Sequence, residues 1–297
     1  MRFGLTILTD LPWAQARPRW QAAEEMGFDH AWTYDHLVWG GLPESPWTTA
    51  TPVLGAVAQV TSTIGLGTLV VSPNFRHPYL LLRDAQALDD LSGGRFLLGV
   101  GTGGNLDSSI LALPELSVRE RVDRFQEFVG VLEQLRDGDH VTSEGRWFST
   151  ADARTLPGLP RTPYLLAANG PRSLRFAARH GDGWVTTGPY GADSVDSWYA
   201  GLAEAAAIFD DAAGEAGRDL GSIPRYVLPD TTPHLMGGAG RFALSSVAFF
   251  EEIAGRVAEL GFTDLVTHWP RRETAYVGDE SVLEAVARDV LPGLQAS

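Results

Sequence analysis

The chain has 297 residues, of which 44% are hydrophobic, and a formal net charge of −14. It contains no cysteine, and its basic residues other than histidine are all arginines. Without cysteine it has neither disulfides nor thiolate-bound metals, and without lysine it has no Schiff-base or P-loop lysine chemistry. The negative charge, without clustered basic residues, argues against nucleic acid as a partner.

No apolar run approaches the length of a membrane span. The N-terminal MRFGLTILTDLPW also lacks a charged leader followed by a long apolar core. We therefore expect a cytoplasmic protein with no membrane partner. The length is one that single-domain α/β barrels commonly reach, so we expect one domain over residues 1–297.

Short apolar runs alternate with amphipathic segments in the first half of the chain. In order, the pattern predicts a strand at 3–9, a helix at 17–26, a strand at 30–33, a helix at 51–61, a strand within 65–73, a helix at 78–91, a strand within 95–104 and a helix at 118–136. The runs at 65–73 and 95–104 alternate poorly, which is typical of strands inside a parallel sheet whose two faces are both covered. The long Gly- and Pro-rich loop after the second strand is typical of functional loops.

The second half begins with an excursion from this alternation. Residues 140–150, HVTSEGRWFST, predict a hairpin around Glu144 and Gly145, which we place as an insertion over a barrel mouth. Strands are then expected at 163–168, 183–187, 225–228 and 264–267, and helices at 174–180, 196–214, 247–260 and 281–290. The glycine-rich stretch 231–240 is a candidate lid. Eight strands, each followed by a helix, favour a (β/α)8 TIM barrel over a doubly wound sheet.

In such a barrel, functional residues lie at the carboxyl ends of the strands. The third and fourth strands end at 69–72 and 102–105, and we expect these two ends to form a shelf for a ring-shaped cofactor. Glycines there let a flat group approach the backbone closely. GVGTGG resembles a dinucleotide fingerprint only loosely, and it lies in the fourth strand rather than the first, so we reject that interpretation.

Two further strand ends carry candidate chemistry. Asn169–Ser173 lies between a strand and a helix, and it is either a phosphate site or an ordinary turn with Pro171 at the first helical position. Asp35 and His36 follow the second strand, where they form either a catalytic pair or a local hydrogen bond. His268 is the only other obvious metal ligand at a strand end, so we expect no metal site.

Together these motifs resemble a known family. The stretch 66–104, with the earlier YDHL, the later AANGPRSLRFAARHGDGW and the final GFTDLVTHWP, is similar to the bacterial luciferase-like monooxygenase superfamily over nearly the whole chain. That resemblance implies a (β/α)8 barrel, usually dimeric, that binds FMN or the deazaflavin coenzyme F420 at its carboxyl mouth. The Asp-His pair of YDHL looks more like the deazaflavin members, so we expect F420, with FMN as the alternative, and a homodimer.

The resemblance also assigns residues to the cofactor. It implies contact of the ring with Thr68, Leu69, Val70, Thr102, Gly103 and Asn105, and of the phosphate with Asn169, Gly170, Pro171, Arg172, Ser173, Thr186 and Thr187. It further implies a non-prolyl cis peptide at Leu69-Val70. One departure concerns the substrate: sugar-phosphate dehydrogenases of the deazaflavin branch carry an acidic residue just after GTG, where this chain has Gly104.

We therefore expect an oxidoreductase that moves hydride between the cofactor and a small organic substrate, with His36 and Asp35 as the catalytic candidates. Trp39, Trp47, His268 and Trp269 are expected to line the substrate pocket. Three alternatives stay open: an FMN-dependent monooxygenase, a non-catalytic flavin-binding subunit, and a phosphate-binding barrel enzyme of the aldolase or isomerase kind. The missing lysine weighs against the last.

Overall fold

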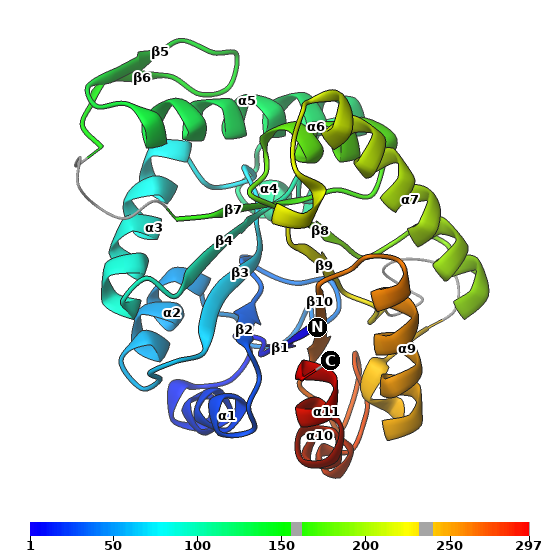
Figure 1. The fold of residues 1–297 in the computed structure, drawn as a ribbon. Helices are drawn as coiled ribbons and strands as arrows, with labels where there is room; N and C mark the ends of the chain where they lie inside the picture. Colours follow the sequence, from blue (N-terminus) through cyan, green and yellow to red (C-terminus); the bar gives the residue numbers. More distant parts are fainter. Residues whose placement is uncertain (156–161, 232–239, 297) are drawn as a thin grey trace.

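A computed structural model describes residues 1–155, 162–231 and 240–296. Its main sheet is a closed barrel in the order β1-β10-β9-β8-β7-β4-β3-β2, and all neighbours are parallel (Figure 1). The strands are β1 Arg2–Thr6, β2 His30–Thr33, β3 Gly65–Val71, β4 Phe96–Val100, β7 Tyr164–Ala167, β8 Gly183–Thr186, β9 Arg225–Val227 and β10 Asp264–His268. The predicted (β/α)8 barrel is confirmed.

Helices follow the strands and surround the barrel (Figure 1). They are α1 Trp13–Glu25, α2 Ala50–Ala58, α3 Pro78–Ser92, α4 Leu106–Ile110, α5 Val118–Asp137, α6 Pro171–His180, α7 Val195–Glu215, α9 Val247–Glu259, α10 Glu280–Ala285 and α11 Leu291–Gln295, with the short helical segments η1 Leu220–Ser222, η2 Ala243–Ser245 and η3 Val286–Val290. Local sequence sets several boundaries: Ser117 and Glu120 form a capping box at the start of α5, and Gly93, at φ +68°, ends α3. None of the helices in the described ranges is long and apolar enough to cross a membrane.

Several boundaries differ from the predicted ones: α1 begins at Trp13, α2 ends at Ala58 and α6 begins at Pro171. The first strand ends at Thr6, although Ile7 N–H still donates to the Trp32 carbonyl at 2.8 Å, and residues 7–9 are buried. The short helix α4 lies where a loop is expected, since five residues are too few to display a helical period. The last helix runs on to Gln295 through the π-helical segment η3. The candidate lid at 231–240 lies almost entirely outside the described residues.

The predicted hairpin forms from β5 Val141–Ser143 and β6 Thr150–Ala153, but its expected place is wrong. It packs on the outside of the helix ring against α5 (Figure 1). The carboxylate of Glu127 on α5 accepts hydrogen bonds of 2.8–3.1 Å from three backbone N–H groups of its turn, and Phe148 packs on Phe128 with ring centroids 5.3 Å apart. These contacts hold the hairpin on the side of the barrel, so it does not cover the mouth.

The amino end of the barrel is filled by aromatic and charged side chains. His30 Nε2 lies 2.8 Å from Asp264 Oδ1, and Trp32 Nε1 donates to His30 Nδ1 at 2.6 Å. Tyr226 packs edge-on against Trp32, and Arg2 closes the end by binding Asp264. Because this end is plugged, the barrel offers ligands access only from the carboxyl end of its strands.

Candidate functional site

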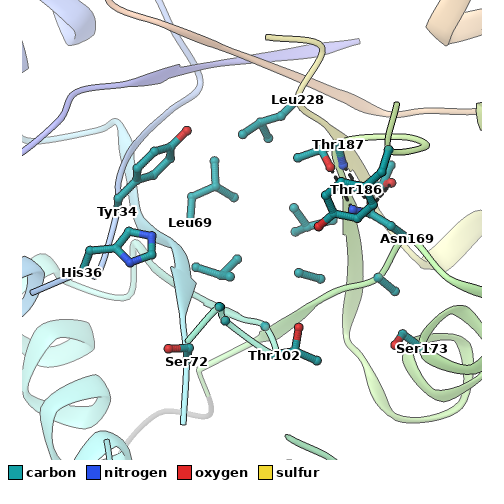
Figure 2. A pocket seen from close by; sticks show the side chains of 18 of the residues that line it. Tyr34, His36, Leu69, Ser72, Thr102, Asn169, Ser173, Thr186, Thr187 and Leu228 are labelled. Carbon is teal, nitrogen blue, oxygen red and sulfur yellow. Dashed lines mark hydrogen bonds between the residues drawn. The ribbon is translucent and has the colours of Figure 1, made fainter. Parts of the chain in front are cut away.

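A cavity of about 730 Å³ opens at the carboxyl ends of the barrel strands. Figure 2 shows Tyr34 and His36 on one side of it and Asn169, Thr186 and Thr187 on the other. The loops after β2, β3, β4, β7, β8, β9 and β10 all contribute lining residues. The cavity is therefore where the sequence places the functional end of the barrel.

The ends of β3 and β4 form one wall of the cavity, built mainly from backbone. Leu69, Val70, Thr102 and Gly103 all line it, and the Leu69-Val70 peptide bond is cis, as the resemblance implies. A Cβ added to Gly101 would lie 2.6 Å from Val70 Cγ2. Gly103 has φ +65°, and its added Cβ would lie 2.6 Å from the side chain of Ser72. These positions need glycine, and they leave a surface that a flat group can approach.

The opposite wall is polar and held by its own hydrogen bonds. Asn169 Oδ1 accepts from Thr186 Oγ1 at 2.7 Å and from the Thr187 N–H at 3.2 Å, and Asn169 Nδ2 donates to Thr187 Oγ1 at 2.8 Å. Next to this group, α6 begins after Gly170 with no side-chain cap among the described residues. Ser173, in the first turn of α6, lines the cavity. The wall therefore offers an anion the positive end of a helix and a hydroxyl group.

Two arginines depart from the sequence-based expectation, which assigns Arg172 to the phosphate and gives Arg121 no role. Arg172 points away from the cavity, donating to Asp123 Oδ1 at 2.5 Å and to Gln126 Oε1 at 2.8 Å on α5. Arg121, in the first turn of α5, lines the cavity instead and donates from Nη1 to the Gly103 carbonyl at 2.7 Å. Its buried Nε has no hydrogen-bond partner among the described residues. Sequence reasoning missed Arg121, because nothing local distinguishes it from the other arginines of that helix.

His36 lines the cavity and is held by a carboxylate that sequence reasoning missed. Its Nδ1 lies 2.8 Å from Oδ2 of Asp107, a buried residue of α4 whose Oδ1 accepts from the Leu37 N–H at 2.8 Å. Burial raises the pKa of Asp107, but the hydrogen bonds from His36 and from the backbone of residues 37 and 38 outweigh it, so this pKa lies below its usual 3.8. The ionised carboxylate accepts from Nδ1–H and leaves Nε2 of His36 free to act.

Asp35 is not among the described lining residues. Its side chain is fully buried, and its two oxygens accept from Arg76 Nη2 at 2.7 Å and Nε at 3.0 Å. Such a two-point ion pair holds the loop after β2 to the loop after β3. The structure therefore separates the two neighbours, with His36 at the cavity and Asp35 in the scaffold behind it.

A second polar group lies on the His36 side of the cavity, where Tyr34, Tyr276 and Asp230 all line it. Tyr34 Oη lies 2.6 Å from His268 Nε2 and 3.0 Å from Tyr276 Oη, and His268 Nδ1 lies 2.7 Å from Asp230 Oδ2. His268 is itself buried behind Tyr34 and stacks on Tyr276 at 3.6 Å. Of these four residues, sequence reasoning identified only His268.

Residues 1–228 match the family model described as luciferase-like monooxygenase. The chain belongs to the luciferase-like monooxygenase family. It is 31% identical to an F420-dependent glucose-6-phosphate dehydrogenase of Beutenbergia cavernae, over 92% of this chain and 91% of that protein. It is 37% identical to an F420-dependent hydroxymycolic acid dehydrogenase of Mycobacterium tuberculosis, over 56% of this chain and 46% of that protein.

The fold of this luciferase-like chain is also that of solved structures. An F420-dependent secondary alcohol dehydrogenase in complex with an F420-acetone adduct superposes with a TM-score of 0.81 and covers 99% of this chain, which covers 98% of it. The two sequences are 18% identical, so this likeness concerns the fold.

Of the remaining expected site residues of this luciferase-like barrel, Trp39 is among the described lining residues of the cavity and the others are not. Trp39 lines the cavity and stacks on Tyr276, whereas Trp47 packs behind it at 6.3 Å. Thr68 Oγ1 donates to the Gly99 carbonyl at 3.1 Å, Asn105 Nδ2 donates to Glu115 and the Leu116 carbonyl, and Trp269 Nε1 donates to Glu280 at 2.9 Å. Gly170 and Pro171 form the start of α6. Within the described ranges, no group of three or more His, Asp or Glu side chains could hold a metal ion.

Proposed function

We propose that this protein is a coenzyme F420-dependent oxidoreductase that transfers hydride between the deazaflavin and a small organic substrate. The observation that carries the proposal is the cavity of about 730 Å³ at the carboxyl ends of the strands, one wall of which is the backbone at the ends of β3 and β4. The F420-dependent dehydrogenases to which the chain is similar support this choice over FMN.

The residues around the cavity fit such a cofactor. Backbone and small residues at Gly101 and Gly103 line the cavity, and side chains there would displace Val70 and Ser72, which also line it. The first turn of α6 with Ser173 would hold a phosphate, as would the Arg121 guanidinium, whose buried Nε lacks a partner among the described residues. Anionic groups of F420 would thus meet a helix N-terminus and a positive charge at the edge of the cavity.

When bound, F420 supplies hydride chemistry at its ring and reacts poorly with oxygen, so it defines the reaction class. The protein orients the reacting groups. Asp107 holds the ring of His36 by Nδ1, so that Nε2 can hold or move a proton over the cavity. Trp39, Leu228 and Tyr276 give the substrate end an apolar lining that excludes water.

We propose that the substrate is not a sugar phosphate. Gly104 lines the cavity where the sugar-phosphate dehydrogenases of the deazaflavin branch carry an acid. Arg121 is the only arginine among the described lining residues, and it lies on the cofactor side beside Gly103. A second phosphate would find no further arginine in the described part of the cavity, so the lining favours a small uncharged substrate.

The test is to titrate the purified protein with F420 and with FMN, following fluorescence. We expect F420 to bind at least tenfold more tightly. Tighter binding of FMN would instead favour a monooxygenase, and cofactor binding without turnover by any substrate or reductant would favour a non-catalytic subunit.

The variant His36→Ala tests the position of the ring. We expect it to lower kcat by about 10²-fold or more, the range that general acid–base groups contribute. His180→Ala, which removes an exposed histidine from the far end of α6, is the matched control and should retain activity. If His36→Ala keeps full activity and cofactor affinity, the placement of the ring is wrong.

We also propose that the protein forms a homodimer. Five large apolar side chains of the segment after β4 are exposed beside the cavity mouth: Leu106, Ile110, Leu111, Leu113 and Val118. Exposed apolar side chains gathered in one segment favour burial against a partner. Light scattering should give about twice the 32.1 kDa of one chain, and a monomer at micromolar concentration would contradict the proposal.

A further inference from the structure

The hydrogen bonds of the Tyr34 group can be given directions from the carboxylate outward. Asp230 Oδ2 accepts from the Thr267 hydroxyl at 2.8 Å and from the His268 N–H at 2.9 Å, and Asp230 Oδ1 accepts from the Ala243 N–H at 2.8 Å. An oxygen surrounded by donors belongs to an ionised carboxylate, which can only accept. The contact of 2.7 Å with His268 Nδ1 is therefore a hydrogen bond donated by Nδ1–H.

With Nδ1 protonated, neutral His268 has an acceptor at Nε2, and the hydroxyl of Tyr34 donates to it at 2.6 Å. The Tyr276 hydroxyl then donates to the Tyr34 oxygen at 3.0 Å. Burial raises the pKa of both phenols, which keeps them protonated at neutral pH. The Tyr34 oxygen keeps one lone pair, and Tyr34 lines the cavity.

We propose that Tyr34 is a catalytic residue that accepts the hydroxyl proton of a carbinol substrate, with His268 and Asp230 as the positioning residues behind it. The inference rests on the proposed function and names its substrate class: an alcohol with apolar substituents, or the corresponding carbonyl compound in the reverse direction. The arrangement follows the logic of a serine–histidine–aspartate triad, with a phenol in place of the serine.

The step balances. With oxidised F420 bound, the carbinol C–H bond would break, and the coenzyme would take up its hydrogen with the electron pair, as hydride. The substrate O–H bond breaks, its proton passes to the Tyr34 oxygen, and the Tyr34 proton passes to His268 Nε2. The electron pair of the O–H bond forms the C=O double bond. The carbonyl product then faces Tyr34, and the imidazolium of His268 is stabilised by the Asp230 carboxylate at 2.7 Å.

The surroundings of Tyr34 favour an apolar alcohol. Its ring packs edge-on against Trp39 at 5.4 Å, and Leu69 and Leu228 belong to the same buried cluster. His36 differs from Tyr34 because it is partly exposed, with 26% of its side chain accessible, whereas only 9% of Tyr34 is. The more buried hydroxyl is better placed to meet a substrate oxygen from which water is excluded.

The barrel also contains a histidine–aspartate pair with a tyrosine beside it that takes no part in the proposed step, and it provides the control. His30 and Asp264 form a second buried histidine–aspartate contact of 2.8 Å at the plugged amino end. Tyr226, beside them, is a buried phenol that accepts a hydrogen bond from Arg2 Nη2 at 3.2 Å and does not line the cavity. Tyr226→Phe therefore removes the same atom from the same barrel, away from the cavity.

The kinetic test compares Tyr34→Phe with Tyr226→Phe, using oxidised F420 and secondary alcohols from 2-propanol to cyclohexanol. We expect Tyr34→Phe to lower kcat by 10²-fold or more and to leave the Kd for F420 within twofold. Tyr226→Phe should keep kcat within threefold. Two results would overturn this inference alone. In the first, Tyr34→Phe binds F420 tightly and keeps full activity. In the second, the wild-type protein binds F420 tightly but turns over no alcohol or carbonyl compound. Failure to bind F420 would overturn the proposed function as well.

A second readout uses the coenzyme-free protein and needs no turnover. Ring ¹⁵N NMR, assigned with His268→Asn, should find His268 neutral with the proton on Nδ1. Tyr34→Phe should shift the Nε2 resonance, because its hydrogen bond is lost, and Asp230→Asn should change the balance of the two tautomers. A His268 protonated on Nε2, or an Nε2 resonance that is indifferent to Tyr34→Phe, would overturn the proposed relay.

Discussion

Replacing Asp35 by asparagine should destabilise the fold and spare the chemistry. The Asp35 carboxylate is fully buried and holds Arg76 at two points, 2.7 and 3.0 Å. Asparagine keeps the size of the side chain but removes its charge, leaving the mostly buried guanidinium with Asp84, at 3.4 Å, as its one ion-pair partner among the described residues. Removing one partner of a buried ion pair costs about 3–5 kcal/mol. The remaining contact with Asp84 favours the lower end of that range.

A loss of about 3 kcal/mol corresponds to a fall in Tm of roughly 5 °C in a chain of this size. Scanning calorimetry measures this fall, and kcat per folded molecule should stay within a fewfold of the wild-type value. Asp84→Asn is the matched control, since this half-buried carboxylate lies 3.4 Å from Arg76 and contributes about 1 kcal/mol or less. An unchanged Tm together with a hundredfold loss of kcat would refute this reasoning and return Asp35 to the catalytic machinery.

Two further predictions concern the cavity wall and the acid stability of the barrel. Gly101→Ala puts a methyl group 2.6 Å from Val70 Cγ2, so it should weaken F420 binding at least tenfold in a fluorescence titration. Gly130→Ala is the control and should leave F420 binding unchanged, because its added methyl group would meet no neighbouring atom within 4 Å. Glu24 accepts hydrogen bonds from three backbone N–H groups before β3, and these outweigh the opposing effect of burial and lower its pKa from 4.5 to about 2. A lowered pKa gives stability that is complete above pH 4.5 and lost as the pH falls towards 2. Urea unfolding should therefore find Glu24→Gln less stable than the wild type at pH 7, with the difference shrinking below pH 4.5; a constant difference would contradict this origin.

The sequence predicts the barrel well because its evidence is local. The second strand is found at His30–Thr33, as predicted, and the long helix α5 begins at Val118, where its capping box lies. Each of these elements is determined by the apolar periodicity and the capping residues of a short stretch of sequence. The glycines at the end of β4 likewise mark the cavity wall before any contact is known.

The site residues depend on pairings that no window contains. Asp35 and Arg76 are 41 positions apart, and His36 and Asp107 are 71 apart. Adjacent in the chain, Asp35 and His36 read as one pair, but the loop after β2 directs them to different partners. Arg121 was missed for the same reason, since its importance comes from its hydrogen bond to the carbonyl of Gly103, 18 positions earlier in the chain.

Among the described residues, three histidines contact buried carboxylates, and comparing them shows how the same pair of side chains can serve the fold or the function. In each, one ring nitrogen meets an aspartate, so the other nitrogen decides the role. In His30 that nitrogen accepts from the Trp32 indole at the plugged end, which makes the pair a brace of the scaffold. In His36 it is left free at the cavity, and in His268 it meets the hydroxyl of Tyr34, which lines the cavity. The same pair of side chains thus supports the fold or prepares a proton transfer according to what the barrel places on its far side.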